Sequence, residues 1–488
     1  MAVAECADLG QRLIELLGED AVLHQPEDVI VYEYDYGLDR AVPQAVVFPR
    51  SAAEVVAVVK LARELDLPVV PRGAGTGISG GAIAVQGGIV IALARMKRIL
   101  DIDLANRAAV VEPGVVNLNI SKAVEPYGLF FAPDPSSQKA CTIGGNVANN
   151  AGGPHCLALG TTTNHVLGLE IVTAEGEIIE LGGVAPERPG YDLTGFVVGS
   201  EGTVGIVTKV FVKLLPKPAA VKTLLAIFDS VDQASASVSG IIGRGIIPSA
   251  LELMDQLALR AVEAAFHAGY PPDAGAVLLV EVDGLAESVA EQSAAVEHVC
   301  RDNGARDVRL AKTDEARARL WAARKGAASA MGRIAPNYYL HDTVIARTRL
   351  PEVLARVVEI GERHRLPIAN LFHAGDGNLH PMILFDIREQ GILERVMEAG
   401  REILQTSVEA GGTISGEHGI GVEKNRFMPW IFSQADLDVM ARARDAFDPS
   451  RRCNPGKVFP IPSACHDTSS RPRARLGRVA ASHPDLWV

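Results

Sequence analysis

The glycine-rich stretch Pro71-Arg-Gly-Ala-Gly-Thr-Gly-Ile-Ser-Gly-Gly81 decides the fold class of this chain. It follows Leu67-Pro-Val-Val70, a short apolar run that is typical of a strand. Part of the stretch matches the G-x-G-x-x-G pattern, but a Rossmann fingerprint must open a helix. Here more glycines and a β-rich run follow up to Leu93, which disfavours a nicotinamide-binding domain. What remains is a row of small residues whose backbone N–H groups can approach a pyrophosphate closely, with Arg72 adding a formal charge.

The segments before this loop have the pattern of a β-α-β unit. Ala45-Val-Val-Phe-Pro49 is typical of a strand, and Ser51-Ala-Ala-Glu54 is a capping box that predicts a helix to about residue 65. Residues 10–20 predict a further short amphipathic helix. Glycine-rich segments recur at 144–145, 152–153 and 199–205. Because several such loops occur, it is more plausible that they bind one common ligand than that each glycine only serves a turn.

The chain of 488 residues is too long for one simple core, so we expect two domains plus extensions. Leu214-Leu-Pro-Lys-Pro218 marks a boundary, because its prolines end a strand. We predict a helical extension over 1–40, as part of a cofactor-binding domain that continues over 41–219. Residues 220–460 alternate strand-like and helical runs and suit a substrate cap, and 461–488 are predicted to be a disordered tail.

Composition excludes several classes of function. A net charge of −12 disfavours a nucleic-acid partner. The six cysteines show no C-x-x-C spacing, so neither a disulfide framework nor an iron–sulfur site is expected in this chain, and a reducing compartment is favoured. No apolar run reaches the roughly 18 residues that span a bilayer, so no transmembrane segment is expected. Glu5 and Asp8 precede any basic residue, which is not the pattern of a secretory signal.

Histidines flank a strong hairpin signal in His373-Ala-Gly-Asp-Gly-Asn-Leu-His380. A two-residue type I′ turn at Asp376-Gly377 would place His373 directly opposite His380, with Cβ atoms roughly 5 Å apart. Two imidazoles at that spacing can chelate a divalent metal. The alternative is a pair of histidines at a strand end that is satisfied by hydrogen bonds.

A second histidine segment is Gly416-Glu417-His418-Gly419-Ile420-Gly421. Glu417 can complete a metal site with His373 and His380, which leaves His418 free as a base. The alternative is that Glu417 hydrogen-bonds to a histidine without contacting a metal.

Together these segments resemble flavoproteins of the vanillyl-alcohol-oxidase type, and the last two resemble the C-terminal signature of their 2-hydroxy-acid dehydrogenase branch. Over residues 20–460 the resemblance is greatest to the FAD-binding subunits of bacterial glycolate oxidases. It implies an α+β fold: an FAD-binding domain of the vanillyl-alcohol-oxidase (PCMH) type, a ferredoxin-like α+β substrate cap and a C-terminal helical segment. The segments that carry it are 71–77, 133–137, 142–152, 199–206, 214–218, 266–271, 321–325, 332–339 and 454–457.

The resemblance also implies which residues hold FAD. The loop 71–77 has Ala74 and no histidine to tether a flavin, so the FAD is expected to be noncovalent. Glu201 has an alternative role as a loop cap. The implied FAD-binding residues are Arg72, Gly73, Ala74, Gly75, Thr76, Gly77, Pro133, Asp134, Ser137, Thr142, Gly144, Gly145, Asn146, Asn149, Gly152, Glu201, Gly202, Ile206 and Asn454.

The activity implied by the resemblance is oxidation of glycolate, or another small D-2-hydroxy acid, to the 2-oxo acid, with the hydride passing to FAD. His418 suits the base for the hydroxyl proton, and Arg324 suits a clamp for the carboxylate. Zinc, manganese or iron bound by His373, His380 and Glu417 would polarise the hydroxyl. For Arg324 the alternative is a solvated helix face.

Pro381-Met382 and Leu340 stand where relatives that oxidise 2-hydroxyglutarate tend to have polar residues, which disfavours a large dicarboxylate. The alternatives are a D-lactate dehydrogenase and a noncatalytic, electron-transferring flavin subunit. The resemblance implies a second flavin subunit and an iron–sulfur subunit as partners. It also implies a location in the cytoplasm, or at the inner face of the bacterial plasma membrane through those partners.

Overall fold

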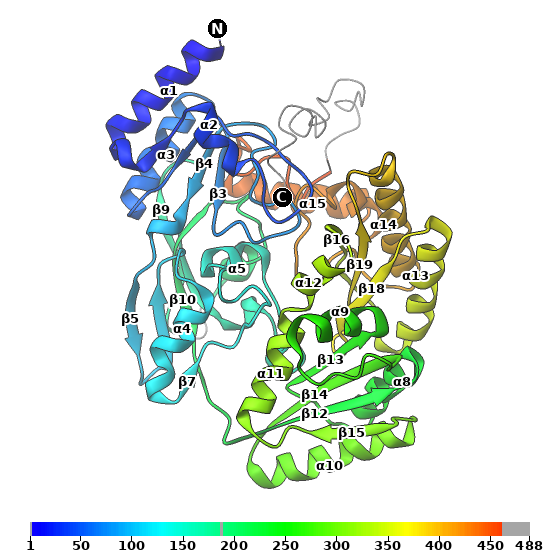
Figure 1. Cartoon of the computed structure of the whole chain (residues 1–488). Coiled ribbons are helices and arrows are strands. Elements are labelled where there is room, and N and C mark those ends of the chain that lie inside the picture. Colours follow the sequence, from blue (N-terminus) through cyan, green and yellow to red (C-terminus); the bar gives the residue numbers. More distant parts are fainter. Residues whose placement is uncertain (1, 186–188, 461–488) are drawn as a thin grey trace.

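The computed structural model describes residues 2–185 and 189–460, with side chains from residue 8 onward. Two α+β lobes lie side by side, an N-terminal domain in blue to cyan and a C-terminal domain in green to orange (Figure 1). The chain crosses between them at β11 (Leu215–Pro216), directly after the strand that ends the N-terminal domain. The prediction of a disordered tail over 461–488 lies outside the described residues.

The first sheet of the N-terminal domain carries the glycine-rich loop at one strand end. Its order is β1-β2-β4-β3, in which β2, β4 and β3 run parallel. The predicted helix is present as α3, which Ser51 caps by accepting a hydrogen bond from Glu54 N at 3.2 Å. The elements are α1 (Ala2–Leu17), β1 (Val22–Leu23), α2 (Pro26–Val29), β2 (Ala45–Val47), α3 (Ala52–Glu64), β3 (Val69–Arg72) and β4 (Ile89–Ala92).

The second sheet of this domain is antiparallel, with the order β5-β6-β10-β8-β9. Its buried face packs on α4 and α5, so the turns around α5 lie between this sheet and the other domain. The elements are β5 (Ile99–Asp103), β6 (Ala108–Val111), α4 (Asn117–Val124), β7 (Leu129–Phe130), α5 (Ile143–Asn149), α6 (Cys156–Leu159), β8 (Val166–Val172), β9 (Ile178–Gly182), α7 (Leu193–Val197) and β10 (Ile206–Lys213).

The C-terminal domain is built on one sheet in the order β15-β12-β14-β13-β18-β19-β16, with β17 also paired to β19. Its first four strands have the ferredoxin-like order, extended by the hairpin β18–β19. The strands are β12 (Ala220–Phe228), β13 (Ala250–Asp255), β14 (Ala276–Gly284), β15 (Asp307–Leu310), β16 (Asn337–Leu340), β17 (Thr343–Val344), β18 (Ile368–His373) and β19 (Asn378–Phe385).

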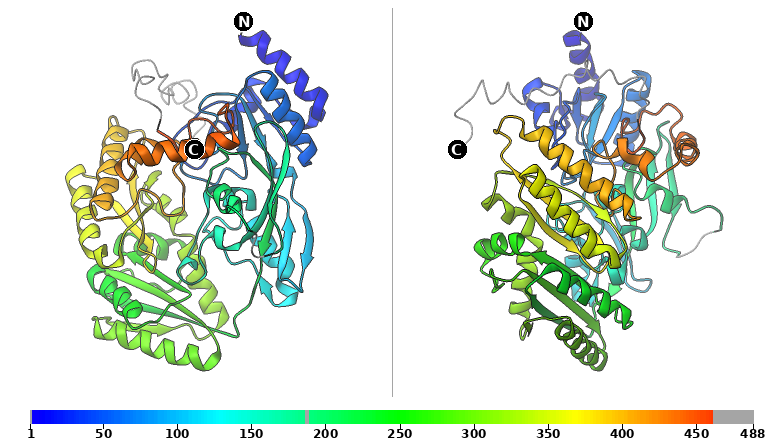
Figure 2. Two further views of the ribbon diagram at one scale, coloured as in Figure 1. Left: turned by 180° about the vertical axis from the view of Figure 1, so that it is seen from behind. Right: turned by 90° about the vertical axis from the view of Figure 1, so that its right-hand side faces the viewer.

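Helices cover both faces of this sheet. α8, α10, α13 and α14 share one apolar core with the outer face, where α13 and α14 lie side by side (Figure 2). α9, α11 and α12 pack on the other face, which looks toward the N-terminal domain. The helices are α8 (Val231–Gly243), α9 (Gln256–Phe266), α10 (Ala286–Asp302), α11 (Asp314–Lys325), α12 (Ala327–Ala330), α13 (Leu350–His364), α14 (Ile392–Glu409) and α15 (Gln434–Phe447).

Two segments make contacts that the predicted domain limits do not include. The extension over 1–40 is not only helical, because Val22 and Leu23 pair with β2. The last described segment returns to the N-terminal domain, where Val69 N donates to Arg452 O and Asn454 N donates to Val69 O. The end of the predicted cap therefore completes the cofactor domain. In the described residues no helix is long and apolar enough to cross a membrane.

Candidate active site

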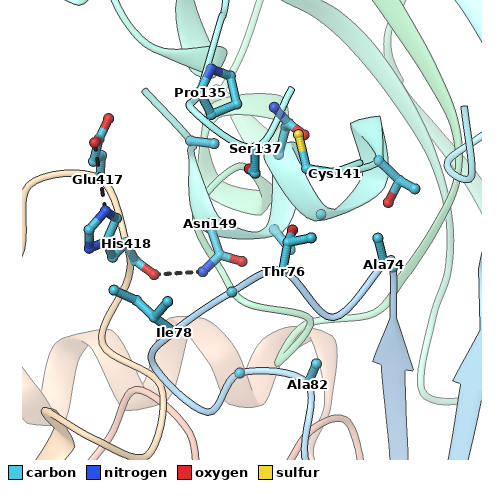
Figure 3. Close-up of a pocket in the computed structure, with 18 of the residues that line it drawn as sticks. Ala74, Thr76, Ile78, Ala82, Pro135, Ser137, Cys141, Asn149, Glu417 and His418 are labelled. Atoms are coloured by element: carbon cyan, nitrogen blue, oxygen red, sulfur yellow. Dashed lines mark hydrogen bonds and ion pairs between the residues drawn. The ribbon is translucent and has the colours of Figure 1, made fainter. Parts of the chain in front are cut away.

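A cavity of ≈270 Å³ lies between the two domains. Figure 3 shows Glu417 and His418 on one side of it, with Ala74, Thr76 and Cys141 across from them. From the predicted residues it collects Arg72, Gly73, Ala74, Gly75, Thr76, Gly77, Ser137, Thr142, Gly144, Gly145, Asn146, Asn149, Gly152, Glu201 and Gly202 on the N-terminal side, and Arg324, His373, His380, Glu417 and His418 on the other.

The N-terminal wall of the cavity has the features of a flavin cradle. A Cβ at Gly73 would lie 2.5 Å from Thr142 Oγ1, whereas one at Gly77 would meet nothing within 4 Å. Thr142 Oγ1 and both polar side-chain atoms of Asn146 are buried and have no hydrogen-bond partner among the described residues. Buried polar groups are rarely left unpaired, so these atoms fit a polar ligand such as the pyrophosphate and ribityl chain of FAD.

Four predicted FAD residues, Pro133, Asp134, Ile206 and Asn454, do not line this cavity. Asn454 Nδ2 donates to Gly81 O and Glu201 O, so it supports two cavity loops from behind. Ile206 is fully buried in the core, and Pro133 O accepts from Asn117 Nδ2. The carboxylate of Asp134 is engaged by Lys325 and His155. Residues next to a ligand loop in sequence can point away from the ligand, so the FAD contacts of these four residues stay predictions.

Glu201 connects the two domains at the cavity. Its carboxylate accepts hydrogen bonds from Ile420 N at 2.6 Å and Gly421 N at 2.8 Å. Burial raises the pKa of Glu201 to about 7, although these two donors act in the opposite direction. The N-terminal domain thereby holds the loop that carries Glu417 and His418.

The hairpin between β18 and β19 differs from the predicted two-residue turn. His373 pairs with Asn378, and His380 pairs with Leu371, so four residues form the turn. A type I′ turn needs positive φ at both central residues, but only Gly377 has it (φ 71°) and Asp376 does not. The predicted direct opposition of the histidines is therefore wrong. They are diagonal neighbours on one face, with ring centroids 5.1 Å apart.

Both hairpin histidines have one ring nitrogen fixed and the other aimed at Glu417. His373 Nδ1 lies 2.7 Å from Glu252 Oε1, and His380 Nδ1 lies 3.3 Å from the backbone oxygen of His341. Their Nε2 atoms lie 3.2 and 3.3 Å from Glu417 Oε1. In metal-binding histidines, one ring nitrogen typically donates to an acceptor and the other binds the metal. Here acceptors hold both Nδ1 atoms, and both Nε2 atoms face the same position beside Glu417.

The spacing of these three groups fits a small divalent ion. Zinc bonds of about 2.0–2.1 Å place tetrahedral ligand atoms about 3.4 Å apart, close to the observed separations from Glu417. Asp342, His380 and His418 form a second possible group. There, Oδ2 of Asp342 accepts from the backbone N–H groups of residues 416–418, whereas its Oδ1 is buried without a hydrogen-bond partner among the described residues. The first group is the better ordered ligand set, because acceptors fix the Nδ1 atoms of both its imidazoles.

An ion-paired arrangement is the alternative to a metal. Although burial lowers the pKa of His373, Glu252 and Glu417 outweigh it and raise that pKa to about 10. The same histidine side chain can thus carry a proton between two carboxylates or bind an ion in its place.

Sequence reasoning missed Glu252 and Asp342. Glu252 lies directly opposite His373 in the β13–β18 pair and is 1% exposed. Asp342 is fully buried and orders the segment 415–418 through its Oδ2 atom. A carboxylate at an inward position of the apolar strand Ala250–Asp255 was the available signal for Glu252, because burying a charge requires a partner.

Arg324 lies in the last turn of α11 and is 2% exposed, which excludes the solvated helix face. Its Nη2 lies 2.5 Å from Glu252 Oε2, and the side chain also lines the cavity. Glu252 therefore holds both the guanidinium and the imidazole of His373. A cation is thus placed in the same cavity as the histidines.

Hydrogen bonds fix the backbone of His418, while its ring lies in the cavity wall. Its carbonyl oxygen accepts from Asn149 Nδ2 at 2.8 Å, drawn as a dashed line in Figure 3, and from Ser79 Oγ at 3.1 Å. Burial lowers the pKa of His418 to about 4, with Asp342 acting in the opposite direction. Nδ1 of His418 has no hydrogen-bond partner, and Nε2 lies 3.7 Å from Glu417. The geometry provides a neutral imidazole beside the proposed metal ligands.

Solved structures share this architecture. p-Cresol methylhydroxylase superposes with a TM-score of 0.79 at 17% identity over 93% of this chain and 97% of the other. 4-Ethylphenol oxidase from Gulosibacter chungangensis gives a TM-score of 0.78 at 18% identity over 95% and 99%. At such identities the likeness establishes the fold, and it confirms the predicted PCMH-type architecture.

Sequence comparisons are more specific. Residues 43–182 match the model "FAD binding domain", and residues 217–458 match "FAD linked oxidases, C-terminal domain". The chain is 49% identical to glycolate oxidase subunit GlcD of Escherichia coli K12 over 91% of this chain and 89% of that protein. GlcD of Bacillus subtilis is 41% identical over 93% and 97%, and a D-lactate dehydrogenase of Anaerostipes hadrus is 32% identical over 86% and 90%. The chain therefore belongs to the FAD-linked oxidases, in the family of the glycolate oxidase subunit GlcD.

Proposed function

We propose that this protein oxidises glycolate, or another small D-2-hydroxy acid, to the corresponding 2-oxo acid and passes the electrons to partner subunits or quinone instead of NAD. The observation that carries the proposal is the convergence of Arg324, His373, His380, Glu417 and His418 on the cavity whose other wall is the FAD cradle. A noncatalytic electron-transfer subunit has no need of this set.

Each residue of the set has a role in that reaction. FAD, when bound, supplies the hydride acceptor. Arg324, which lines the cavity, binds the substrate carboxylate through its guanidinium group, while Glu252 holds its Nη2 atom. His418, which lines the same wall, accepts the hydroxyl proton at Nε2, the ring nitrogen 3.7 Å from Glu417, because its Nδ1 is buried 4.0 Å from Asp342 Oδ2.

His373, His380 and Glu417 would hold a divalent ion such as zinc, manganese or iron. An ion at this position would supply Lewis acidity toward the substrate hydroxyl. Glu252 and the backbone oxygen of His341 orient the two imidazoles, so that both Nε2 atoms remain available as ligands.

Apolar residues in the cavity wall disfavour a substrate with a second carboxylate. Ala328, Leu340, Leu371 and Met382 line the cavity on the same side as Arg324 and His380. A second carboxylate against these side chains would be buried without a partner, which costs several kcal/mol. Glycolate and D-lactate fit this wall better than D-2-hydroxyglutarate, because they have no second carboxylate.

A substrate screen tests the proposal. With an artificial dye as the acceptor, we expect kcat/KM for glycolate or D-lactate to exceed that for D-2-hydroxyglutarate by about 10²-fold or more, since an unpaired buried polar group is penalised strongly. L-lactate serves as the stereochemical control. If none of the four acids reduces the flavin, the proposed function is wrong. The order of glycolate and D-lactate decides between the two named substrates.

The flavin is expected to be noncovalent, because Ala74 and its neighbours in 71–77 offer no histidine or cysteine for a covalent bond. Acid or heat precipitation of the purified holoenzyme should release all the yellow colour into the supernatant. Colour that remains in the washed pellet would contradict this prediction.

Electron transfer requires partners. The six cysteines provide no iron–sulfur ligand set, and the GlcD relatives are named as subunits. A second flavin subunit and an iron–sulfur subunit are therefore proposed as partners. The protein would work in the cytoplasm, or at the inner face of the plasma membrane through these partners.

A further inference from the structure

A polar cluster fills the boundary between the two domains beside the cavity, and the reaction proposed above uses none of its members. Asp134 and His155 come from the N-terminal domain, before α6. The other members come from β14 and from one face of α11. We call this the interdomain cluster; it consists of Asp134, His155, Glu281, Arg317, Trp321 and Lys325.

The cluster joins the domains through charge-assisted contacts. Asp134 Oδ2 lies 2.7 Å from Lys325 Nζ and 2.9 Å from His155 Nδ1. His155 Nε2 lies 3.4 Å from Glu281 Oε1. Glu281 also accepts from Arg317 Nη2 at 2.6 Å and from Trp321 Nε1 at 2.6 Å. The two carboxylates at the centre of these contacts are shielded from water, because the side chains of Asp134 and Glu281 are 13% and 2% exposed, whereas Arg317 at the edge is 38% exposed.

The imidazole of His155 lies between two carboxylates. Burial lowers the pKa of His155, but Asp134 and Glu281 outweigh it and raise that pKa to about 10. The ring is then an imidazolium at neutral pH, with both N–H groups donating. It also lies against Trp321, with ring centroids 5.5 Å apart.

Helix α11 presents two adjacent faces. Residues 317, 321 and 325 follow the i, i+4, i+8 spacing, so they lie on one face. Trp321 and Lys325 meet His155 and Asp134 of the N-terminal domain, whereas Arg317 is linked to it through Glu281. Arg324 occupies the same last turn but points to Glu252 and the cavity. Any shift of α11 along the domain boundary would therefore move the guanidinium relative to the FAD cradle.

We propose that Asp134 and His155 are positioning residues, which fix α11 to the N-terminal domain and so place Arg324 for the substrate carboxylate. This rests on the proposed function of Arg324. It gives Asp134 a role different from the FAD contact that the sequence predicted. The clamp and the flavin belong to different domains, and a misplacement of about 1 Å in such a site can cost about 10²-fold in rate.

The test compares two ion pairs of similar exposure. Asp134→Asn and Lys325→Met break the interdomain pair, whose side chains are 13% and 22% exposed; Lys325 also lines the cavity, so Asp134→Asn is the decisive variant. Glu170→Gln and Lys209→Met break a control pair within the N-terminal sheet, 15% and 28% exposed at 2.8 Å. We expect the first two variants to raise KM for glycolate by about 10-fold with FAD content unchanged, since they loosen the site. The control variants should leave KM within about 2-fold, as for an ordinary partly exposed pair.

A double-mutant cycle separates positioning from general destabilisation. Arg324→Ala should itself raise KM strongly, and adding Asp134→Asn to it should change KM no further, because the cluster acts through Arg324. Additive effects on KM, an unchanged KM in Asp134→Asn, or loss of FAD from that variant would each overturn the proposal.

Hydrogen exchange tests the positioning without turnover. Amides of α11 in the holoenzyme should exchange faster in Asp134→Asn than in the wild type, and Glu170→Gln should leave them unchanged. Equal exchange in all three proteins would overturn the proposed fixing of α11. If α11 loosens as expected but wild-type protein oxidises no 2-hydroxy acid, the failure lies with the proposed reaction.

Discussion

His418→Ala should slow reduction of the flavin by glycolate about 10²–10⁴-fold, the range for a lost general base. The physical reason is local: burial keeps the His418 imidazole of the cavity wall neutral, and its Nε2, 3.7 Å from Glu417, is the ring nitrogen that takes the proton. Its backbone oxygen, which Asn149 and Ser79 hold, remains in the variant, so the loop should keep its shape. The measurement is single-turnover bleaching of the flavin at saturating glycolate in an anaerobic stopped-flow instrument.

Two variants serve as controls for His418. His418→Asn preserves a polar side chain but cannot accept a proton at neutral pH, so it should be as slow as His418→Ala. His364→Ala removes a partly buried imidazole that pairs with Glu402 at 3.0 Å on the outer helices, and it should reduce at the wild-type rate. If His418→Ala bleaches its flavin as fast as the wild type, His418 is not the base.

Removal of the proposed metal should abolish turnover while FAD stays bound. The ligands His373, His380 and Glu417 come from the C-terminal domain, whereas the FAD cradle is built from N-terminal loops. Dialysis against a chelator and the His380→Ala variant should therefore both give yellow, inactive protein. Elemental analysis of the active enzyme should find one divalent ion per chain, and returning that ion should restore the dialysed wild type but not His380→Ala.

The Glu252→Gln variant tests whether the carboxylate that orients His373 supports metal binding. It keeps the shape of the side chain but weakens the hold on His373 Nδ1 and on Arg324. Loss of such an outer partner typically lowers metal affinity by about 10–100-fold, so activity should return at higher metal concentration. Active enzyme without stoichiometric metal would show instead that His373 works as an ion-paired imidazolium between Glu252 and Glu417.

Local patterns in the sequence determined much of the fold. The glycine-rich loop after β3, the Ser51 cap of α3 and the boundary near residue 215 depend on neighbours a few residues apart, so they could be predicted. The shared face of His373 and His380 was also predictable, because side chains alternate along strands. Their exact register was not, since it depended on the backbone that Asp376 adopts in the turn.

Only the tertiary structure decided the partners of the buried charges. Glu252 meets His373 across strands separated by 121 residues, and Asp134 meets Lys325 across 191 residues. No local periodicity links such pairs, because an ion pair depends on how sheets and domains pack and not on spacing along the chain. The sequence thus determined the cofactor class and the candidate chemistry of this protein. The packing of its two domains decided which carboxylates orient the histidines and which one fixes the helix that carries Arg324.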